Sequence, residues 1–195
     1  MIKTKKVAIF GGTFDPIHRG HIYLAEEIIK AGDFDQLIVV PAGSPWQRPA
    51  VASAEDRLEM VRRAFTRDDV LVSDCEVVRR SPSYAIDTVR ELKTQDSTSN
   101  FTWIIGSDAL GGLESWHQIN ELSKMVDFLV IIRPGYEIQS AHIPNFINWR
   151  SLEIGALDMS ATEIRRALHE NREVGAMLTP DVLSYIREKR LYGAA

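Results

Sequence analysis

The chain has 195 residues, with 23 Lys and Arg against 27 Asp and Glu, so its formal net charge is −4 when the histidines are neutral. Proteins that bind nucleic acid polymers carry a basic surplus or a dense Lys/Arg stripe, so this charge argues against that function class. Hydrophobic residues make up 45% of the chain and charged residues 26%, values typical of a globular protein and not of a disordered or fibrous one. We therefore expect a single domain over residues 1–195.

Cysteine content and hydropathy bear on the compartment. Cys75 is the only cysteine in the sequence, so no internal disulfide can form and a reducing compartment is allowed. The apolar runs, for example at 37–40 and 128–132, have the length of a strand, whereas a membrane span needs about 18 to 20 apolar residues. We expect a cytoplasmic protein that does not associate with a membrane.

The first elements predict a parallel sheet. Residues 7–10 form an apolar run that ends at Gly11 and Gly12, as expected of a strand buried on both faces. Residues 18–31 place apolar side chains at helical spacing, and residues 37–40 form a second apolar run. A strand, a helix and a strand within about 35 residues make a βαβ unit, whose strands run parallel.

The alternation of strands and helices continues along the chain. A capping-box pattern at Ser53 marks the start of a helix. Further helices are predicted at 53–65, 84–93 and 119–125, and further strands at 70–73, 101–105 and 127–132. This order predicts an α/β fold, a single doubly wound and mostly parallel sheet with helices on both faces.

Two stretches, 42–52 and 134–150, lack this periodicity and are predicted to be loops, the first of them where ligand-binding loops commonly lie, after the carboxyl end of a strand. Near the end of the chain, a second capping-box pattern begins at Ser160, and Thr179 with Pro180 is typical of a helix start. The tail is therefore predicted to form helices from about residue 160.

The first predicted strand and helix are joined by Gly11-Gly12-Thr13-Phe14-Asp15-Pro16-Ile17-His18-Arg19-Gly20-His21. Glycines at such a junction let the backbone approach a ligand, and the helix N-terminus offers N–H groups and a partial positive charge to an anion. His18 and His21 share one face of the first helical turn, and each can donate to phosphate oxygens. The residues alone leave two interpretations open, a phosphate site or a tight turn whose histidines cap the helix.

Other ligands fit this segment less well. A zinc site needs three or four ligands, and no paired cysteines accompany His18 and His21. The Gly-Lys-Ser/Thr ending of a Walker loop is missing, and the glycine spacing does not match the dinucleotide fingerprint G-x-G-x-x-G. We therefore expect neither a metal held by protein ligands nor redox use of a bound nicotinamide.

The segment 11–21 closely resembles the signature of nucleotidyltransferases with a His-x-Gly-His motif, and its Gly-Gly-Thr-Phe-Asp-Pro opening resembles the nicotinate-nucleotide adenylyltransferase family. Further matches follow in order over nearly the whole chain: Ser83-Tyr84-Ala85-Ile86-Asp87-Thr88, Gly106-Ser107-Asp108 with Trp116, Arg133-Pro134-Gly135, Met159-Ser160-Ala161-Thr162-Glu163-Ile164-Arg165 and Leu191-Tyr192. The resemblance implies a Rossmann-like fold and transfer of the adenylyl group of ATP to nicotinate mononucleotide, giving nicotinate adenine dinucleotide and pyrophosphate. The implied partners are ATP and nicotinate mononucleotide, with Mg²⁺ accompanying the ATP.

The resemblance also implies a site for ATP. His18 and His21 would contact the phosphates and the charge that develops at the α-phosphoryl group, and Arg165 with the hydroxyls before it would clamp the pyrophosphate. These three residues form the implied catalytic set. The implied ATP-binding residues are Gly11, Gly12, Thr13, Phe14, His18, His21, Gly106, Asp108, Arg133, Ser160, Thr162 and Arg165. Taken without the resemblance, Ser160 is equally an ordinary N-cap and Asp108 a loop-forming residue.

On the nicotinate side, the resemblance implies that Trp116 stacks on the pyridine ring, Thr88 lies near it and Trp46 closes over it. Arg48 stands where relatives carry a lysine, and its different geometry leaves its role open. Trp103 lies inside a predicted strand, so we expect it in the core. Two alternative functions remain, the same transfer to nicotinamide mononucleotide and a domain that binds nucleotides without catalysis.

Overall fold

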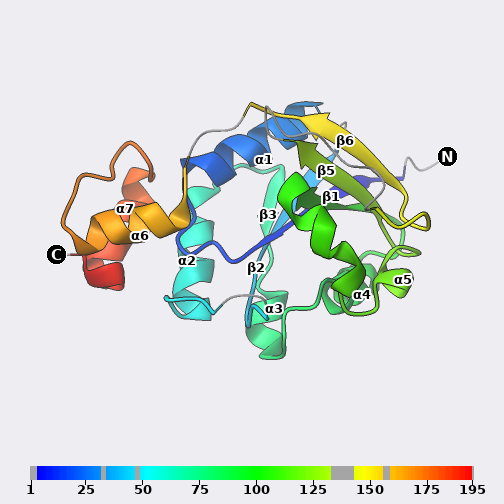
Figure 1. Cartoon of the computed structure of the whole chain (residues 1–195), viewed down its shortest axis with the longest axis horizontal. Coiled ribbons are helices and arrows are strands. Elements are labelled where there is room, and N and C mark those ends of the chain that lie inside the picture. Colours follow the sequence, from blue (N-terminus) through cyan, green and yellow to red (C-terminus); the bar gives the residue numbers. More distant parts are fainter. Residues whose placement is uncertain (1–3, 32–33, 47–48, 133–142, 156–158, 195) are drawn as a thin grey trace.

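The structure is a computed structural model that describes residues 4–31, 34–46, 49–132, 143–155 and 159–194. Within these residues, six strands form one sheet in the order β3-β2-β1-β4-β5-β6 (Figure 1). They are β1 (Lys6–Gly12), β2 (Gln36–Pro41), β3 (Val70–Val72), β4 (Asn100–Gly106), β5 (Asp127–Ile132) and β6 (Trp149–Glu153). All neighbouring strands pair in parallel, which confirms the predicted α/β sheet.

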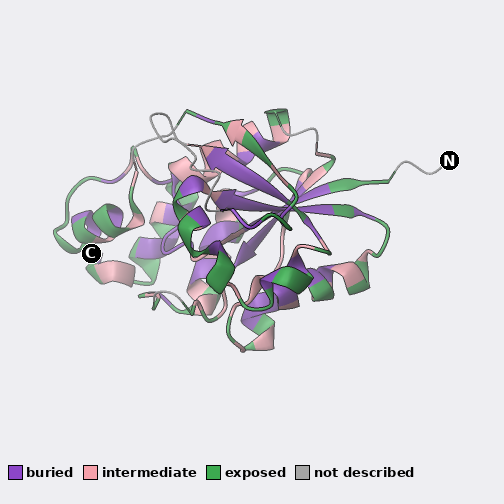
Figure 2. Cartoon of the chain, turned by 45° about the vertical axis from the view of Figure 1, so that its right-hand side comes forward, coloured by how far each residue is buried: buried purple, intermediate pink, exposed green. Residues whose placement is uncertain are grey.

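Helices cover both faces of the sheet, as predicted. Successive residues of β1 point to opposite faces: Ala8 and Phe10 join one buried cluster, and Val7 and Ile9 join the other. The first cluster includes residues of α1 (Arg19–Ala31) and α2 (Ala54–Ala64), and the second includes residues of α4 (Ala85–Gln95) and α5 (Ile119–Leu122). In Figure 2 the central strands are accordingly buried between layers of helices.

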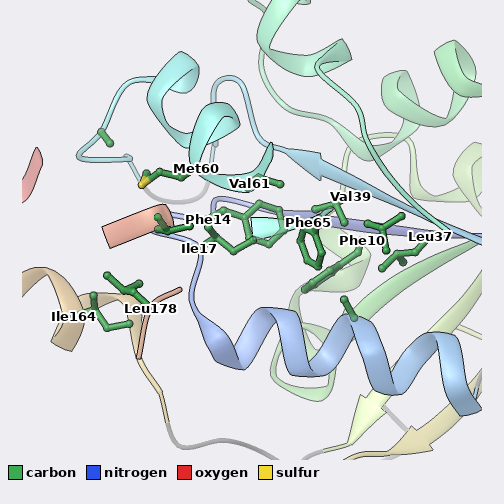
Figure 3. Packing of buried hydrophobic residues seen from close by; sticks show 14 of the residues in the cluster. Phe10, Phe14, Ile17, Leu37, Val39, Met60, Val61, Phe65, Ile164 and Leu178 are labelled. Atoms are coloured by element: carbon green, nitrogen blue, oxygen red, sulfur yellow. The ribbon is translucent and has the colours of Figure 1, made fainter. Parts of the chain in front are cut away.

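The last part of the chain packs beside α2 (Figure 1). It consists of α6 (Ala161–His169), α7 (Pro180–Glu188) and a 3-10 turn, η3 (Leu191–Gly193). Ile164 and Leu178 belong to the same buried cluster as Phe10 and Met60 (Figure 3), so this part shares the main core. Thr179 caps α7 by accepting from the backbone N–H of Val182, which confirms the predicted helix start.

Three details differ from the sequence prediction. The strand β6 begins inside the stretch 134–150 that was predicted to be a loop, because an exposed edge strand such as Trp149–Glu153 needs no continuous apolar run. Two short elements, α3 (Cys75–Arg79) and the 3-10 helix η1 (Ser107–Ser115), were not predicted.

None of the helices in the described parts of the chain is long and apolar enough to cross a membrane.

Candidate functional site

A cleft lies where the strand order reverses. The strand β2 pairs with one edge of β1, and β4, which comes later in the chain, pairs with the other edge. In open α/β sheets, ligands bind outside the carboxyl ends of the strands at such a point. The structure has a cavity of about 480 Å³ there, and its lining includes Gly11, Gly12 and Thr13 at the end of β1 and Gly106 and Asp108 at the end of β4. Five of the predicted ATP-binding residues therefore line one cavity.

Aromatic rings pack directly behind the glycines of β1. A Cβ atom on Gly11 would lie 3.0 Å from the ring of Trp103, and one on Gly12 would lie 2.8 Å from the ring of Phe14. Both distances are too short for a side chain to fit without a shift. Trp103 is buried in the core as predicted, and its ring also forms part of the cavity wall. The missing Cβ atoms thus let the rings pack against the backbone of β1 where both glycines line the cavity.

His18 and His21 lie face to face at the N-terminus of α1. Their ring centroids are 3.7 Å apart with an angle of 25° between the planes. The backbone N–H of His18 donates to Nδ1 of His21 at 3.3 Å. With Nδ1 as the acceptor, the neutral imidazole carries its proton on Nε2, which can donate to a phosphate oxygen. The ring of His21 meets that of Phe14 edge to face, with centroids 5.1 Å apart, and neither histidine is part of the lining of the cavity.

The segment 159–165 contacts the segment 11–21. A Cβ atom on Gly20, between the two histidines, would lie 3.6 Å from Cβ of Met159, just before α6. In α6, Nη2 of Arg165 donates to Oγ1 of Thr162 at 3.2 Å, and Nη1 donates to the carbonyl oxygen of Asp15 at 2.6 Å. The N-termini of α1 and α6, each favourable for anions, therefore converge beside the cleft.

Ser160 occupies the N-cap position of α6, yet its side chain makes no capping hydrogen bond. The capping-box pattern therefore predicted the helix start correctly and the role of the hydroxyl incorrectly. The predicted contact of this hydroxyl with a phosphate stays a prediction.

Aromatic side chains line the other end of the cavity. Trp46 is 45% exposed, and its ring centroid lies 6.2 Å from that of Tyr84. Tyr84 in turn stacks on His117, with centroids 4.4 Å apart and an angle of 28°. Trp116 meets Trp103 edge to face at 6.3 Å. Flat rings that line a cleft suit a planar heteroaromatic ligand.

Sequence reasoning missed Tyr84 and His117 as cleft residues. Both stand in or beside stretches that carried the family resemblance: Tyr84 is the second residue of the segment 83–88, and His117 follows Trp116. An aromatic ring close in sequence to a predicted binding residue was the available signal.

The structure places the side chain of Thr88 behind the wall of the cavity. Thr88 is fully buried and does not line the cavity, whereas Ala85, one helical turn earlier, does. The hydroxyl of Thr88 donates to Oε1 of Glu76 at 2.5 Å and accepts from Nη2 of Arg79 at 3.1 Å. Glu76 itself lines the cavity, so the side chain of Thr88 supports the cleft wall from behind, and its predicted contact with the nicotinate stays a prediction.

The burial of Glu76 should make the free energy of unfolding depend on pH. Burial raises the pKa of Glu76 above its ordinary value of 4.5, and hydrogen bonds from Ser83 and Thr88 oppose this shift only in part. The folded chain therefore holds this proton more tightly than the unfolded chain does. The free energy of unfolding should then fall as the pH rises from about 4.5 through the raised pKa, by at most about 1.4 kcal/mol per pH unit.

A Glu76→Gln variant cannot ionise at this position, so it should lack this contribution. We expect the free energy of unfolding of the variant, minus that of the wild type, to become more positive with rising pH. Urea unfolding of both proteins at several values between about pH 4 and about pH 8 measures this difference. A difference that stays constant over this range would contradict the account.

Two predicted residues, Arg48 and Arg133, lie outside the described residues, so their predicted contacts remain predictions. The described parts of the chain contain no group of three or more His, Cys, Asp or Glu side chains that could hold a metal ion. The donors beside the cleft are imidazole, guanidinium, hydroxyl and backbone N–H groups, which are suited to phosphate oxygens.

Comparisons with known proteins agree with this geometry. Residues 9–167 match the Cytidylyltransferase-like family model. A probable nicotinate-nucleotide adenylyltransferase of Halalkalibacterium halodurans is 38% identical over 192 residues, which cover 96% of this chain and 91% of the relative. One of the same name from Oceanobacillus iheyensis is 35% identical over 192 residues, with 97% of each chain covered. The chain belongs to the nicotinate-nucleotide adenylyltransferase family.

A solved structure extends the agreement to the fold. The nicotinic acid mononucleotide adenylyltransferase of Plasmodium falciparum, complexed with NaAD, superposes with a TM-score of 0.80 over 98% of both chains at 20% identity. At this identity the likeness shows the fold alone. Membership of the nicotinate-nucleotide adenylyltransferase family confirms the resemblance on which the site residues were predicted. Their individual contacts with ligands remain predictions.

Proposed function

We propose that the chain transfers the adenylyl group of ATP to nicotinate mononucleotide, producing nicotinate adenine dinucleotide and pyrophosphate. The observation that carries this proposal is that two kinds of group meet at the cleft. The N-termini of α1 and α6, with His18, His21 and Arg165, lie beside the cavity, and we call this part the phosphate end. The rings of Trp46 and Tyr84 in the lining form a part that we call the aromatic end. Phosphates suit the first and a pyridine ring suits the second.

In the proposed reaction, an oxygen of the mononucleotide phosphate attacks the α-phosphorus of ATP. A new P–O bond forms there, and the bond from the α-phosphorus to the oxygen bridging the β-phosphorus breaks, so that pyrophosphate leaves with that oxygen. A phosphate monoester is already a nucleophile, so no side chain needs to form a covalent intermediate. The protein contributes alignment of the two substrates and stabilisation of the developing charge.

In this reaction Nε2 of His21 would donate to the α-phosphoryl oxygens, and Arg165 with Thr162 would hold the β- and γ-phosphates. Asp108, at the end of β4, would accept from ribose hydroxyls. We also propose that ATP enters as its Mg²⁺ complex, the ion being held by phosphates and water. When bound, Mg²⁺ would neutralise charge on the leaving pyrophosphate.

The N-terminus of α4 is our reason for proposing nicotinate mononucleotide, the acid, and not nicotinamide mononucleotide, the amide, as the acceptor. Ser83, Tyr84 and Ala85 line the cavity where this helix begins, and the N-cap residue Tyr84 makes no side-chain capping hydrogen bond. A helix N-terminus favours a carboxylate over a neutral amide through its N–H groups and its dipole. The chain therefore offers a charged nicotinate ring a more favourable partner than it offers nicotinamide.

We propose further that the chain acts as one domain, since β1, α2, α6 and α7 all contribute to one buried cluster, and that it acts in the cytoplasm, as its sequence leads us to expect.

The test of the function is a comparison of nicotinate and nicotinamide mononucleotides as acceptors, with pyrophosphate release as the readout. We expect kcat/KM to be at least about tenfold higher for the acid. A higher kcat/KM for the amide would overturn the substrate assignment, and no release with either would overturn the activity.

A further inference from the structure

Asp15 links the two ends of the cleft, although it lies outside the lining of the cavity. Its side chain is buried, and the carboxylate accepts from the backbone N–H groups of Val51 at 2.7 Å and Ala52 at 3.1 Å. These two residues lie in the connection between β2 and α2, which also carries Trp46 and which we call the Trp46 loop. The backbone carbonyl of Asp15 accepts from Arg165 at 2.6 Å. One residue of the first motif therefore bonds both the proposed pyrophosphate clamp and the loop of the aromatic end.

The carboxylate of Asp15 has a third donor, from the far end of the chain. The hydroxyl of Tyr192 donates to Oδ1 of Asp15 at 2.7 Å, across 177 positions of sequence. Tyr192 makes this contact with a left-handed backbone, φ 58°, which a tyrosine seldom adopts. Burial and the neighbouring carboxylate raise the pKa of Tyr192, so the hydroxyl keeps its proton and remains a donor.

Arg57 holds the same loops together from within the core. Its side chain is buried, and it donates to the carbonyl oxygens of Thr13 at 2.7 Å, Gly43 at 3.2 Å and Ala52 at 3.3 Å. Thr13 belongs to the phosphate end of the cleft, and Gly43 and Ala52 lie in the Trp46 loop. Burial lowers the pKa of Arg57, and the negative charge of Asp15 offsets part of that cost. The two charged groups thus support one another between the loops.

We propose that Tyr192, acting through Asp15, is a positioning residue for adenylyl transfer. By fixing the carboxylate of Asp15, Tyr192 sets the spacing between the Arg165 clamp and the Trp46 loop, and hence between the α-phosphorus of ATP and the attacking phosphate. This inference rests on the proposed function. In-line transfer tolerates little misplacement of the two reactants, so a small shift of either loop should slow the chemical step more than it weakens binding.

Replacing Tyr192 by phenylalanine removes only the oxygen atom that contacts Asp15. The matched control is Tyr185→Phe, because the hydroxyl of Tyr185 also donates to a carboxylate, Oδ1 of Asp56 at 2.9 Å, on α2 and away from the cleft. Both variants should fold and lose similar stability. We expect Tyr192→Phe to lower kcat about tenfold or more with both KM values changed less than about threefold, and Tyr185→Phe to keep the wild-type kcat.

A second readout does not depend on activity. Amide hydrogen exchange at Val51 and Ala52, measured on the full chain without substrates, should be faster in Tyr192→Phe than in the wild type and unchanged in Tyr185→Phe. Faster exchange in a chain that fails to transfer adenylyl groups would support the positioning contact and overturn only the proposed function. Unchanged exchange with unchanged kcat, or an equal loss of kcat in both variants, would overturn the inference.

Discussion

Replacing His21 by alanine should lower kcat about 100- to 1,000-fold while leaving the KM for ATP nearly unchanged. The reason is that the charge on the α-phosphoryl oxygens grows as the reaction proceeds, so a donor at Nε2 is worth most in the transition state. The structure supplies this donor because the backbone N–H of His18 occupies Nδ1 of His21. Steady-state kinetics with both substrates varied measures the two constants separately.

His21→Gln is the informative companion to this variant. A glutamine amide can place an N–H donor near the position of Nε2, so this variant should recover part of the lost kcat. Thermal unfolding of both variants checks that the stacked pair with His18 is not needed for folding. A wild-type kcat in His21→Ala would refute the role assigned to this residue.

Replacing Arg165 by alanine should have a comparably large effect, but on a different constant. We expect kcat/KM for ATP to fall about 100-fold or more, with a marked rise in KM, because the guanidinium would hold the β- and γ-phosphates in the ground state as well as in the transition state. Arg165→Lys keeps the charge and loses the planar fork, so its kcat/KM should lie between those of the wild type and the alanine variant.

The adjacent arginine provides the control. Arg166 is exposed, and its Nη2 lies 4.0 Å from Oε1 of Glu163 on the surface of α6. Arg166→Ala therefore removes the same charge from the same helix and leaves the hydrogen bonds of Arg165 to Asp15 and Thr162 in place. We expect it to retain the wild-type kcat/KM, because exposed ion pairs contribute little. Equal losses in the two alanine variants would show that net charge, and not the clamp, determines ATP affinity.

The central strands could be predicted from the sequence because their burial on both faces produces continuous apolar runs, as in β1 and β2. The edge strand β6 could not, because its residues are mostly exposed and carry no such pattern. The short helix α3 has five residues, too few for a helical period to stand out. Burial and element length together decided which elements could be predicted.

The residues of the candidate site differ in the same way. Those of the phosphate end could be predicted because the glycines and histidines form one continuous motif at a strand-to-helix junction. The pyridine end depends on which turn of α4 faces the cleft, and sequence spacing could not separate Ala85 from Thr88. Glu76 was missed because an acidic residue in a sequence is usually exposed, and its burial arises only from tertiary packing.

Adenylyl transfer is tested most sharply with ATP labelled at the α-phosphorus, the 195-residue chain and nicotinate mononucleotide. Because the proposed attack occurs at that phosphorus, we expect the label in the dinucleotide and unlabelled pyrophosphate. Label in free AMP, with no dinucleotide formed, would show hydrolysis in place of transfer. That result, or an absence of turnover, would refute the proposed function.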